Sequence, residues 1–72
     1  MSGLTKLQRD LLERGAATWV GIIGSVGMRD ADARKALMGL ERKGLVFEDG
    51  VSWFIQPAGR EAVAAVTGGR AW

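Results

Sequence analysis

The 72-residue sequence contains no cysteine and no histidine. The lack of cysteine excludes disulfides and thiolate metal sites, and the lack of histidine removes the commonest metal ligand and acid–base group. Carboxylates would have to carry any catalysis, but the eight Asp and Glu residues are scattered and show no catalytic pair. We therefore expect no enzyme, no metal or other cofactor, and no small-molecule ligand.

Long hydrophobic runs are also missing. The longest uncharged run, residues 15–28, is shorter than the about 20 residues that a membrane helix needs. The N-terminal region mixes Asp10 and Glu13 with its bases, which does not fit a secretory signal. A net charge of +2 and a pI of about 9.7 are compatible with a polyanionic partner. These features predict a soluble, cytoplasmic protein that does not bind membranes.

A chain of this length predicts one small domain with a thin core. We expect residues 1–67 to form the domain and residues 68–72 to be a C-terminal tail. A capping box at Thr5 and Gln8 predicts a first helix that ends near Gly15. The core is expected to contain the following residues: Leu7, Leu11, Ala33, Leu37, Leu40, Leu45 and Ile55.

The clearest predicted element is a helix over residues 30–43. Asp30 is a typical N-cap, and Gly44 a typical residue just beyond the C-terminus in a Schellman arrangement. Apolar residues recur inside this helix at helical spacing, namely Ala33, Ala36, Leu37 and Leu40. This repeat predicts that one side of the helix is buried and the opposite side is exposed.

Residues 18–26 are ambiguous. Their large apolar residues fit the helical template, namely Trp19, Ile22, Ile23 and Val26, and Thr18 is a candidate N-cap. However, Thr, Trp, Val and Ile favour strands, and Gly21 and Gly24 each cost about 1 kcal/mol in a helix. We expect a short helix here, with a strand as the alternative.

The segment after Gly44 predicts a hairpin and a final helix. A two-residue type I′ turn is expected at 49–50, with Val46 pairing Trp53 across the hairpin. Pro57 suits the first position of a last helix, which would run until Gly68. The predicted order is therefore helix, helix, helix, hairpin, helix.

Two segments resemble the winged helix-turn-helix domains of bacterial and phage regulators of the MarR- or PadR-like kind. "ARKALMGLERKGLV", residues 33–46, is similar to a recognition helix that turns into a wing. "FIQPAGREAV", residues 54–63, is similar to the exit from a wing into a closing helix. The resemblance implies a mainly α fold with a small β-hairpin (α+β), built as a three-helix core plus wing and C-terminal helix. It also implies a transcriptional or phage-type regulator.

On a helical wheel, the side of helix 30–43 that faces away from the core is basic. The resemblance implies that this side reads the major groove of double-stranded DNA, with Arg34 and Lys35 best placed for base or phosphate contacts. Arg29 would contact the DNA backbone, and the helix end at Thr18 would hold another phosphate. The residues assigned to DNA binding are Arg29, Arg34, Lys35, Met38, Arg42 and Thr18. The alternative is a solvated face whose charges pair within the helix, as Asp30 with Arg34 or Asp32 with Lys35.

The hairpin lacks the basic residues of a DNA-contacting wing. No Lys or Arg lies between Lys43 and Arg60, and Glu48 and Asp49 at the tip would be repelled by phosphate. Both hairpin faces are largely apolar, so that a protein-interaction module is the second hypothesis for function. The residues assigned to that role are Phe47, Trp53, Phe54 and Trp72. The alternative is that both faces of the hairpin pack against helices as part of a thin core.

We also expect a homodimer, because DNA sites of helix-turn-helix proteins often consist of two half-sites about 34–36 Å apart. The candidate dimer surfaces are the aromatic hairpin and the last helix, the latter with Val63, Val66 and Trp72.

Overall fold

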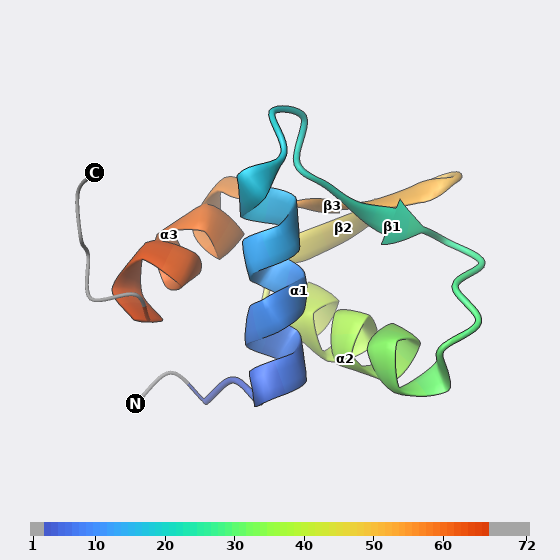
Figure 1. Cartoon of the computed structure of the whole chain (residues 1–72), viewed down its shortest axis with the longest axis horizontal. Helices are drawn as coiled ribbons and strands as arrows, with labels where there is room; N and C mark the ends of the chain where they lie inside the picture. The colour runs from blue at the N-terminus through green and yellow to red at the C-terminus, as the bar shows by residue number, and fades with distance from the viewer. Residues whose placement is uncertain (1–2, 67–72) are drawn as a thin grey trace.

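The computed structural model describes residues 3–66 as an α+β fold with three helices and one antiparallel sheet. The elements in chain order are α1 (Lys6–Ala17), β1 (Ile22–Ser25), α2 (Ala31–Arg42), β2 (Val46–Asp49), β3 (Ser52–Ile55) and α3 (Pro57–Val66). α1 crosses the middle of the molecule, with α3 on one side of it and the sheet and α2 on the other (Figure 1). The predicted tail, residues 68–72, and the predicted helix end at Gly68 lie outside the described residues.

The capping box predicted for the first helix is confirmed. The hydroxyl of Thr5 accepts a hydrogen bond from the Gln8 amide at 3.1 Å, and the Gln8 side chain accepts one from the Thr5 amide at the same distance. Both partners therefore satisfy amides that the first turn of a helix leaves free. The helix runs two residues past Gly15, to Ala17.

Both predicted ends of α2 are confirmed as well. The Asp30 carboxylate accepts hydrogen bonds from two amides of the first turn. At the other end, Gly44 has a φ of 75°, which favours glycine. The amides of Gly44 and Leu45 donate to the carbonyls of Glu41 and Leu40, each at 3.0 Å. This pair of bonds is the Schellman motif, and it directs the chain sharply from α2 into β2.

The helix predicted over residues 18–26 is wrong, because Ile22–Ser25 forms strand β1. Gly21 has a φ of 80°, which a continuing right-handed helix does not allow. β1 then pairs antiparallel with β3, with Ile22 opposite Phe54 and Ser25 opposite Ser52. The described residues therefore contain no second helix before α2, and the three helices are α1, α2 and α3.

The hairpin is confirmed, but its predicted register is wrong. Val46 lies opposite Ile55, not Trp53, and the two residues between the paired ends of the strands are 50–51, not 49–50. Because the pairing shifts by two residues, the side chains stay on the same faces. The strand order β1-β3-β2 places β3 in the centre of the sheet.

The core lies between the helices and one face of the sheet. Its buried members are Leu11, Leu12, Ile23, Ala33, Leu37, Leu40, Val46, Trp53 and Ile55. Most of the predicted core is thereby confirmed, but Leu45 is only partly buried and Leu7 is 36% exposed. No polar or charged residue is buried among the residues that the structure describes.

The last helix begins at Pro57 as predicted and packs on α1. Its Arg60 guanidinium donates from Nη1 to the Ala16 carbonyl at 3.1 Å and from Nη2 to the Thr18 carbonyl at 3.3 Å. A cation at the C-terminus of α1 suits the helix dipole there. Arg60 thus joins the first helix to the last one. Within residues 3–66, the helices are too short or too polar to cross a bilayer.

Candidate nucleic-acid interface

The basic side predicted for α2 is exposed in the structure. Arg34, Lys35, Met38 and Arg42 all reach solvent, and we call these four residues the α2 outer face. Met38 is 54% exposed, while Leu37 and Leu40 are fully buried on the opposite side of the same helix. The α2 outer face is therefore a consequence of the apolar repeat that fixes which side of the helix packs on the core.

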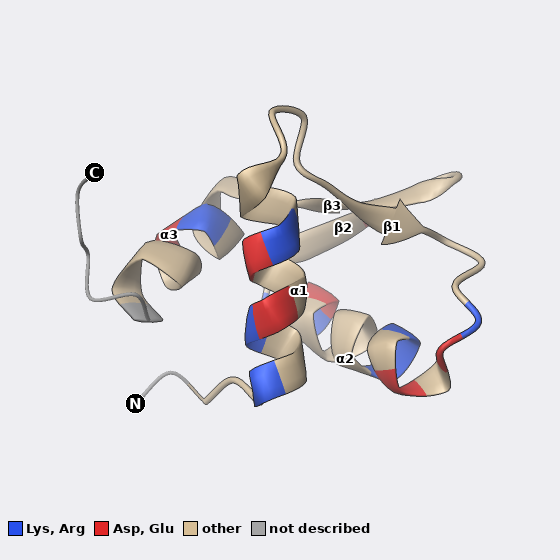
Figure 2. Cartoon of the chain, in the orientation of Figure 1, with Lys and Arg blue, Asp and Glu red and all other residues tan. Residues whose placement is uncertain are grey.

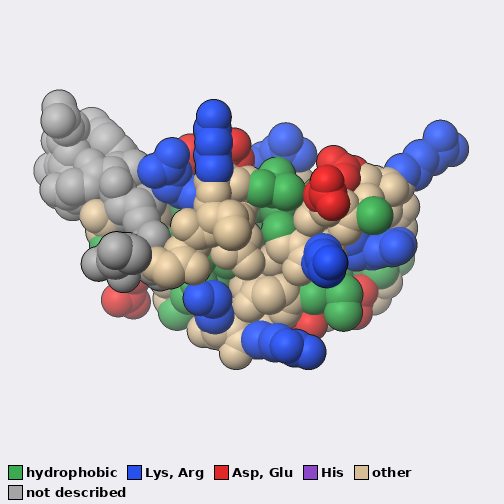
Figure 3. Space-filling view, turned by 90° about the horizontal axis from the view of Figure 1, so that it is seen from below, with side chains coloured by type: hydrophobic (Ala, Val, Ile, Leu, Met, Phe, Trp, Pro, Cys, Tyr) green, Lys and Arg blue, Asp and Glu red, His purple; other side chains and the backbone are tan. Residues whose placement is uncertain are grey.

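Acidic residues flank this face but form no ion pairs with it. Asp32 and Glu41 are exposed, whereas the Asp30 carboxylate is occupied by the amides at the helix start. Within the described part of the chain, neither the Asp30–Arg34 nor the Asp32–Lys35 pair forms an ion pair, contrary to the alternative drawn from the sequence. The basic side chains are thus not neutralised by carboxylates of their own helix. Basic and acidic side chains alternate over the molecule seen from the α2 side (Figure 3).

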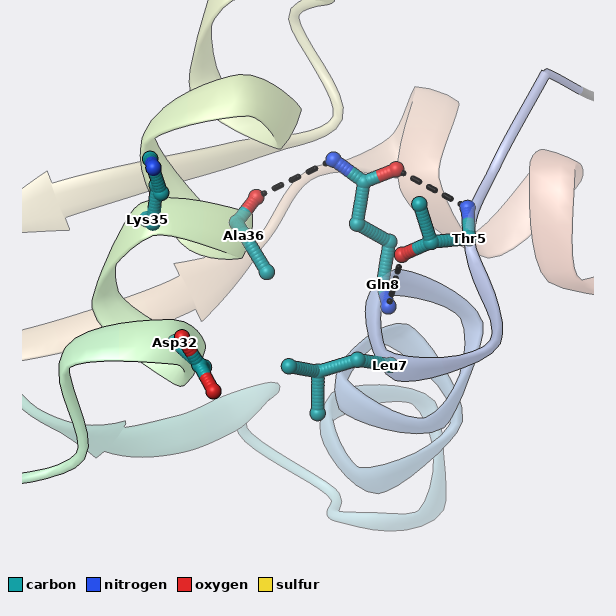
Figure 4. A pocket seen from close by; sticks show the side chains of 6 residues that line it. All are labelled: Thr5, Leu7, Gln8, Asp32, Lys35 and Ala36. Atoms are coloured by element: carbon teal, nitrogen blue, oxygen red, sulfur yellow. Dashed lines mark hydrogen bonds between the residues drawn. The ribbon is translucent and has the colours of Figure 1, made fainter.

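One polar side-chain contact joins α1 to α2, beside the apolar core that packs them together. The Gln8 side chain reaches from the first turn of α1 and donates from Nε2 to the Ala36 carbonyl at 3.4 Å (Figure 4). The same amide group accepts from Thr5, so the capping box also orients the bridge. A shallow hollow at this contact is lined by Thr5, Leu7, Gln8, Asp32, Lys35 and Ala36 (Figure 4).

A second hollow lies on the α2 outer face itself. It is lined by Lys35, Met38, Gly39 and Arg42. Two cations and a flexible thioether around a depression suit an anionic partner with apolar edges, such as phosphates beside base edges. Among the described residues, no cluster of Asp and Glu has the makings of a metal site.

Of the two other residues assigned to DNA binding, Arg29 is exposed, whereas Thr18 does not stand at the start of a helix. Arg29 is exposed directly before the N-cap of α2, in the segment that follows β1. The phosphate site predicted at Thr18 is wrong, because Thr18 caps the C-terminus of α1 and begins no helix. Its hydroxyl donates to the Gly15 carbonyl at 3.0 Å, and the C-terminal end of a helix dipole repels anions.

The aromatic residues of the hairpin divide between its two faces. Phe47 and Phe54 stack on the outer face with ring centroids 5.4 Å apart, and Phe47 is 40% exposed. Trp53 is only 3% exposed, so the prediction that it offers a binding surface is wrong. It lies in the core, where its indole N–H has no acceptor among the described residues. Trp72 lies outside the described residues.

Sequence reasoning missed the most exposed aromatic residue among those that the structure describes. Trp19 is 97% exposed in the turn between α1 and β1, and its neighbour Val20 is 59% exposed. The helical template had placed Trp19 on a buried face. The strand-forming residues of this segment and its two glycines, Gly21 and Gly24, were the signals in the sequence against that helix.

Charge is distributed unevenly between these regions. Lys and Arg occur on all three helices and just before α2, whereas the α1–β1 turn and β1 carry no charge (Figure 2).

Comparisons with family models, with curated proteins and with solved structures gave no match to the chain. A function for this chain is therefore proposed from its sequence and its geometry alone.

Proposed function

We propose that the protein is a small double-stranded DNA-binding protein of winged-helix type, acting as a transcriptional or phage-type regulator. The α2 outer face would enter the major groove, with Arg34 reading a base and Lys35 and Arg42 neutralising phosphates. The observation that carries the proposal is that these cations project from one face of a firmly capped helix and have no ion-pair partner among the described residues.

Two features of the fold support this use of α2. The helix is oriented by Gln8 from α1 and is followed directly by the hairpin through the Schellman turn at Gly44. A rigidly held helix loses little conformational entropy when it binds a groove. The hairpin tip carries Glu48 and Asp49 and would stay away from phosphate, so the helix has to supply the contacts.

The test is the salt dependence of binding to duplex DNA, measured by fluorescence anisotropy. Each phosphate neutralised should contribute a slope of about −0.9 in log K against log salt. Lys35→Gln should weaken binding to all sequences and reduce the magnitude of the slope by about 1, and Arg34→Gln should cost about 1–3 kcal/mol at one base pair. Arg14→Gln, which removes an exposed cation from the last turn of α1, is the matched control and should change neither property.

Absence of duplex binding at low salt would contradict the proposal. An equal effect of Arg14→Gln and Lys35→Gln would also contradict it, because binding would then follow net charge and not the α2 outer face.

A protein-interaction module is the second candidate function, favoured by the exposed Phe47 and its stacking on the partly buried Phe54. Under this hypothesis, Phe47→Ser abolishes binding of a partner protein while Arg34→Gln has no effect. The interaction would also depend weakly on salt, because apolar contacts do not release counterions.

A further inference from the structure

One large apolar side chain is exposed on α2, and it lies on the α2 outer face. Met38 is 54% exposed, whereas the other large apolar residues of this helix, Leu37 and Leu40, are fully buried. The structure describes every residue of α2, so Met38 is the only exposed residue of that kind in the helix. A single exposed apolar residue is ordinary on a protein surface, and its surroundings therefore decide what it means.

The surroundings of Met38 are cationic. Arg34 and Arg42 are four residues away on either side, and Lys35 is three residues before it. Residues at these spacings are neighbours on one side of a helix. All three cations are exposed and have no ion-pair partner among the described residues. An apolar side chain is thus enclosed by positive charge that the protein itself does not neutralise.

The spacing on this side of α2 suits the reading of base edges. Four exposed residues stand at positions i, i+3, i+4 and i+7, namely Ala31, Arg34, Lys35 and Met38. This is a spacing by which a recognition helix brings four side chains into one major groove. Met38 lies about 6 Å along the helix from both Arg34 and Arg42, or about two base-pair steps. A groove that receives these arginines would therefore bring base edges to Met38.

The chemistry around Met38 selects among possible ligands. The hollow beside its side chain is lined by Lys35, Met38, Gly39 and Arg42. A phosphate alone would not use the thioether, and an apolar peptide would not use the cations. The major groove offers phosphates at its rim and one apolar group among its base edges, the C5-methyl group of thymine. A flexible Met side chain can adapt its shape to such a group.

We propose that Met38 is a specificity-determining residue that reads the C5-methyl group of a thymine in the major groove. The methyl group enters the hollow and packs on the thioether, while Lys35 and Arg42 hold phosphates at the rim. This inference rests on the proposed function, since it concerns the same face of α2. Burial of one methyl group corresponds to an affinity about fourfold higher than for the same base without it.

The experiment first selects the duplexes that the full chain prefers from a pool with a random central segment. Each thymine of the selected duplex is then replaced singly by deoxyuridine, which removes the methyl group and keeps the phosphates and the hydrogen-bonding edge. Binding is measured by fluorescence anisotropy. The unaltered protein should lose about fourfold in affinity at one thymine. Met38→Ala should bind the original duplex and that deoxyuridine duplex equally.

The variants have matched controls. Met38→Ala removes no charge, so that the slope of log K against log salt should stay unchanged. Because Met38 is more than half exposed, circular dichroism and thermal unfolding of this variant should match those of the unaltered protein. Met38→Leu keeps an apolar side chain and should retain a preference for thymine over deoxyuridine. Val51→Ser removes an apolar side chain that is 78% exposed at the hairpin tip, and it should retain the whole preference.

Several outcomes would overturn the inference and leave the proposed function in place. These are a selected duplex without thymine, equal binding of the thymine and deoxyuridine duplexes by the unaltered protein, or a deoxyuridine effect that persists in Met38→Ala. The last result would mean that the methyl group acts through the shape of the DNA and not through Met38. Absence of any duplex binding would instead contradict the proposed function itself, and this inference with it.

Discussion

Replacement of Gly59 by alanine should destabilise the fold through a contact with backbone, not with a side chain. Gly59 is buried in the first turn of α3. A Cβ added there would collide with the Leu45 carbonyl oxygen and would lie 2.7 Å from Cγ1 of Ile55. The Leu45 carbonyl is itself fixed, since it accepts the Gln56 amide at 2.9 Å. The collision can therefore be relieved only by moving α3 away from the start of β2.

The expected change in the free energy of unfolding of Gly59→Ala is the difference between two effects. Alanine in place of glycine gains about 1 kcal/mol in a helix, while overpacking of a tight site costs about 1–3 kcal/mol and sometimes more. Because the obstacle at Gly59 is backbone, the cost should lie at or above the upper end of that range. We expect a net loss of about 2 kcal/mol or more, and a loss of about 2 kcal/mol lowers the melting temperature of a domain of this size by about 8–16 °C.

Gly39→Ala is the matched control in α2. A Cβ there would lie 2.8 Å from Nε2 of Gln8, the end of a flexible side chain that can turn away. Losing the hydrogen bond from Gln8 to Ala36 costs about 0.5–1.5 kcal/mol, which the gain in helix propensity offsets. Thermal unfolding followed by circular dichroism should thus separate the two variants. A Gly59→Ala protein that melts at or above the temperature of the unaltered one would refute the reasoning.

Two further variants test the core and the start of α2. Leu37→Ala removes a fully buried side chain and should cost about 2–5 kcal/mol in urea unfolding; a loss below about 1 kcal/mol would mean that α2 is not packed as described. Asp30→Ala removes the acceptor of two amides at the N-terminus of α2 and should cost about 1 kcal/mol, with faster hydrogen exchange in the first turn of that helix. Unchanged exchange there would show that the cap does not stabilise the helix.

The elements that the sequence predicted correctly are those with local causes. Thr5 with Gln8, Asp30, Gly44 and Pro57 each act within one helical turn, and all four signals were confirmed. The sequence also predicted the solvent-facing side of α2, because the apolar repeat of that helix decides it. These features need no knowledge of the rest of the fold.

The features that were missed depend on distant partners. Ile22 fits a helix by spacing, but its place is decided by Phe54, far along the chain, with which it pairs in the sheet. The burial of Trp53, which lies opposite Gly24, belongs to the same pairing. The sequence also did not determine the register of the hairpin. Residues 49–50 and residues 50–51 both contain the glycine that the turn needs. Local pattern could not distinguish between them.

The α2 outer face and the outer face of the sheet lie on opposite sides of the core, since α2 and the sheet each turn one face inward (Figure 1). The exposed Phe47, with Phe54 and Ile22 opposite it across the strands, therefore faces away from any duplex that α2 would bind. DNA bound by α2 would leave this apolar row open, so that the protein could hold a duplex and a partner protein at the same time.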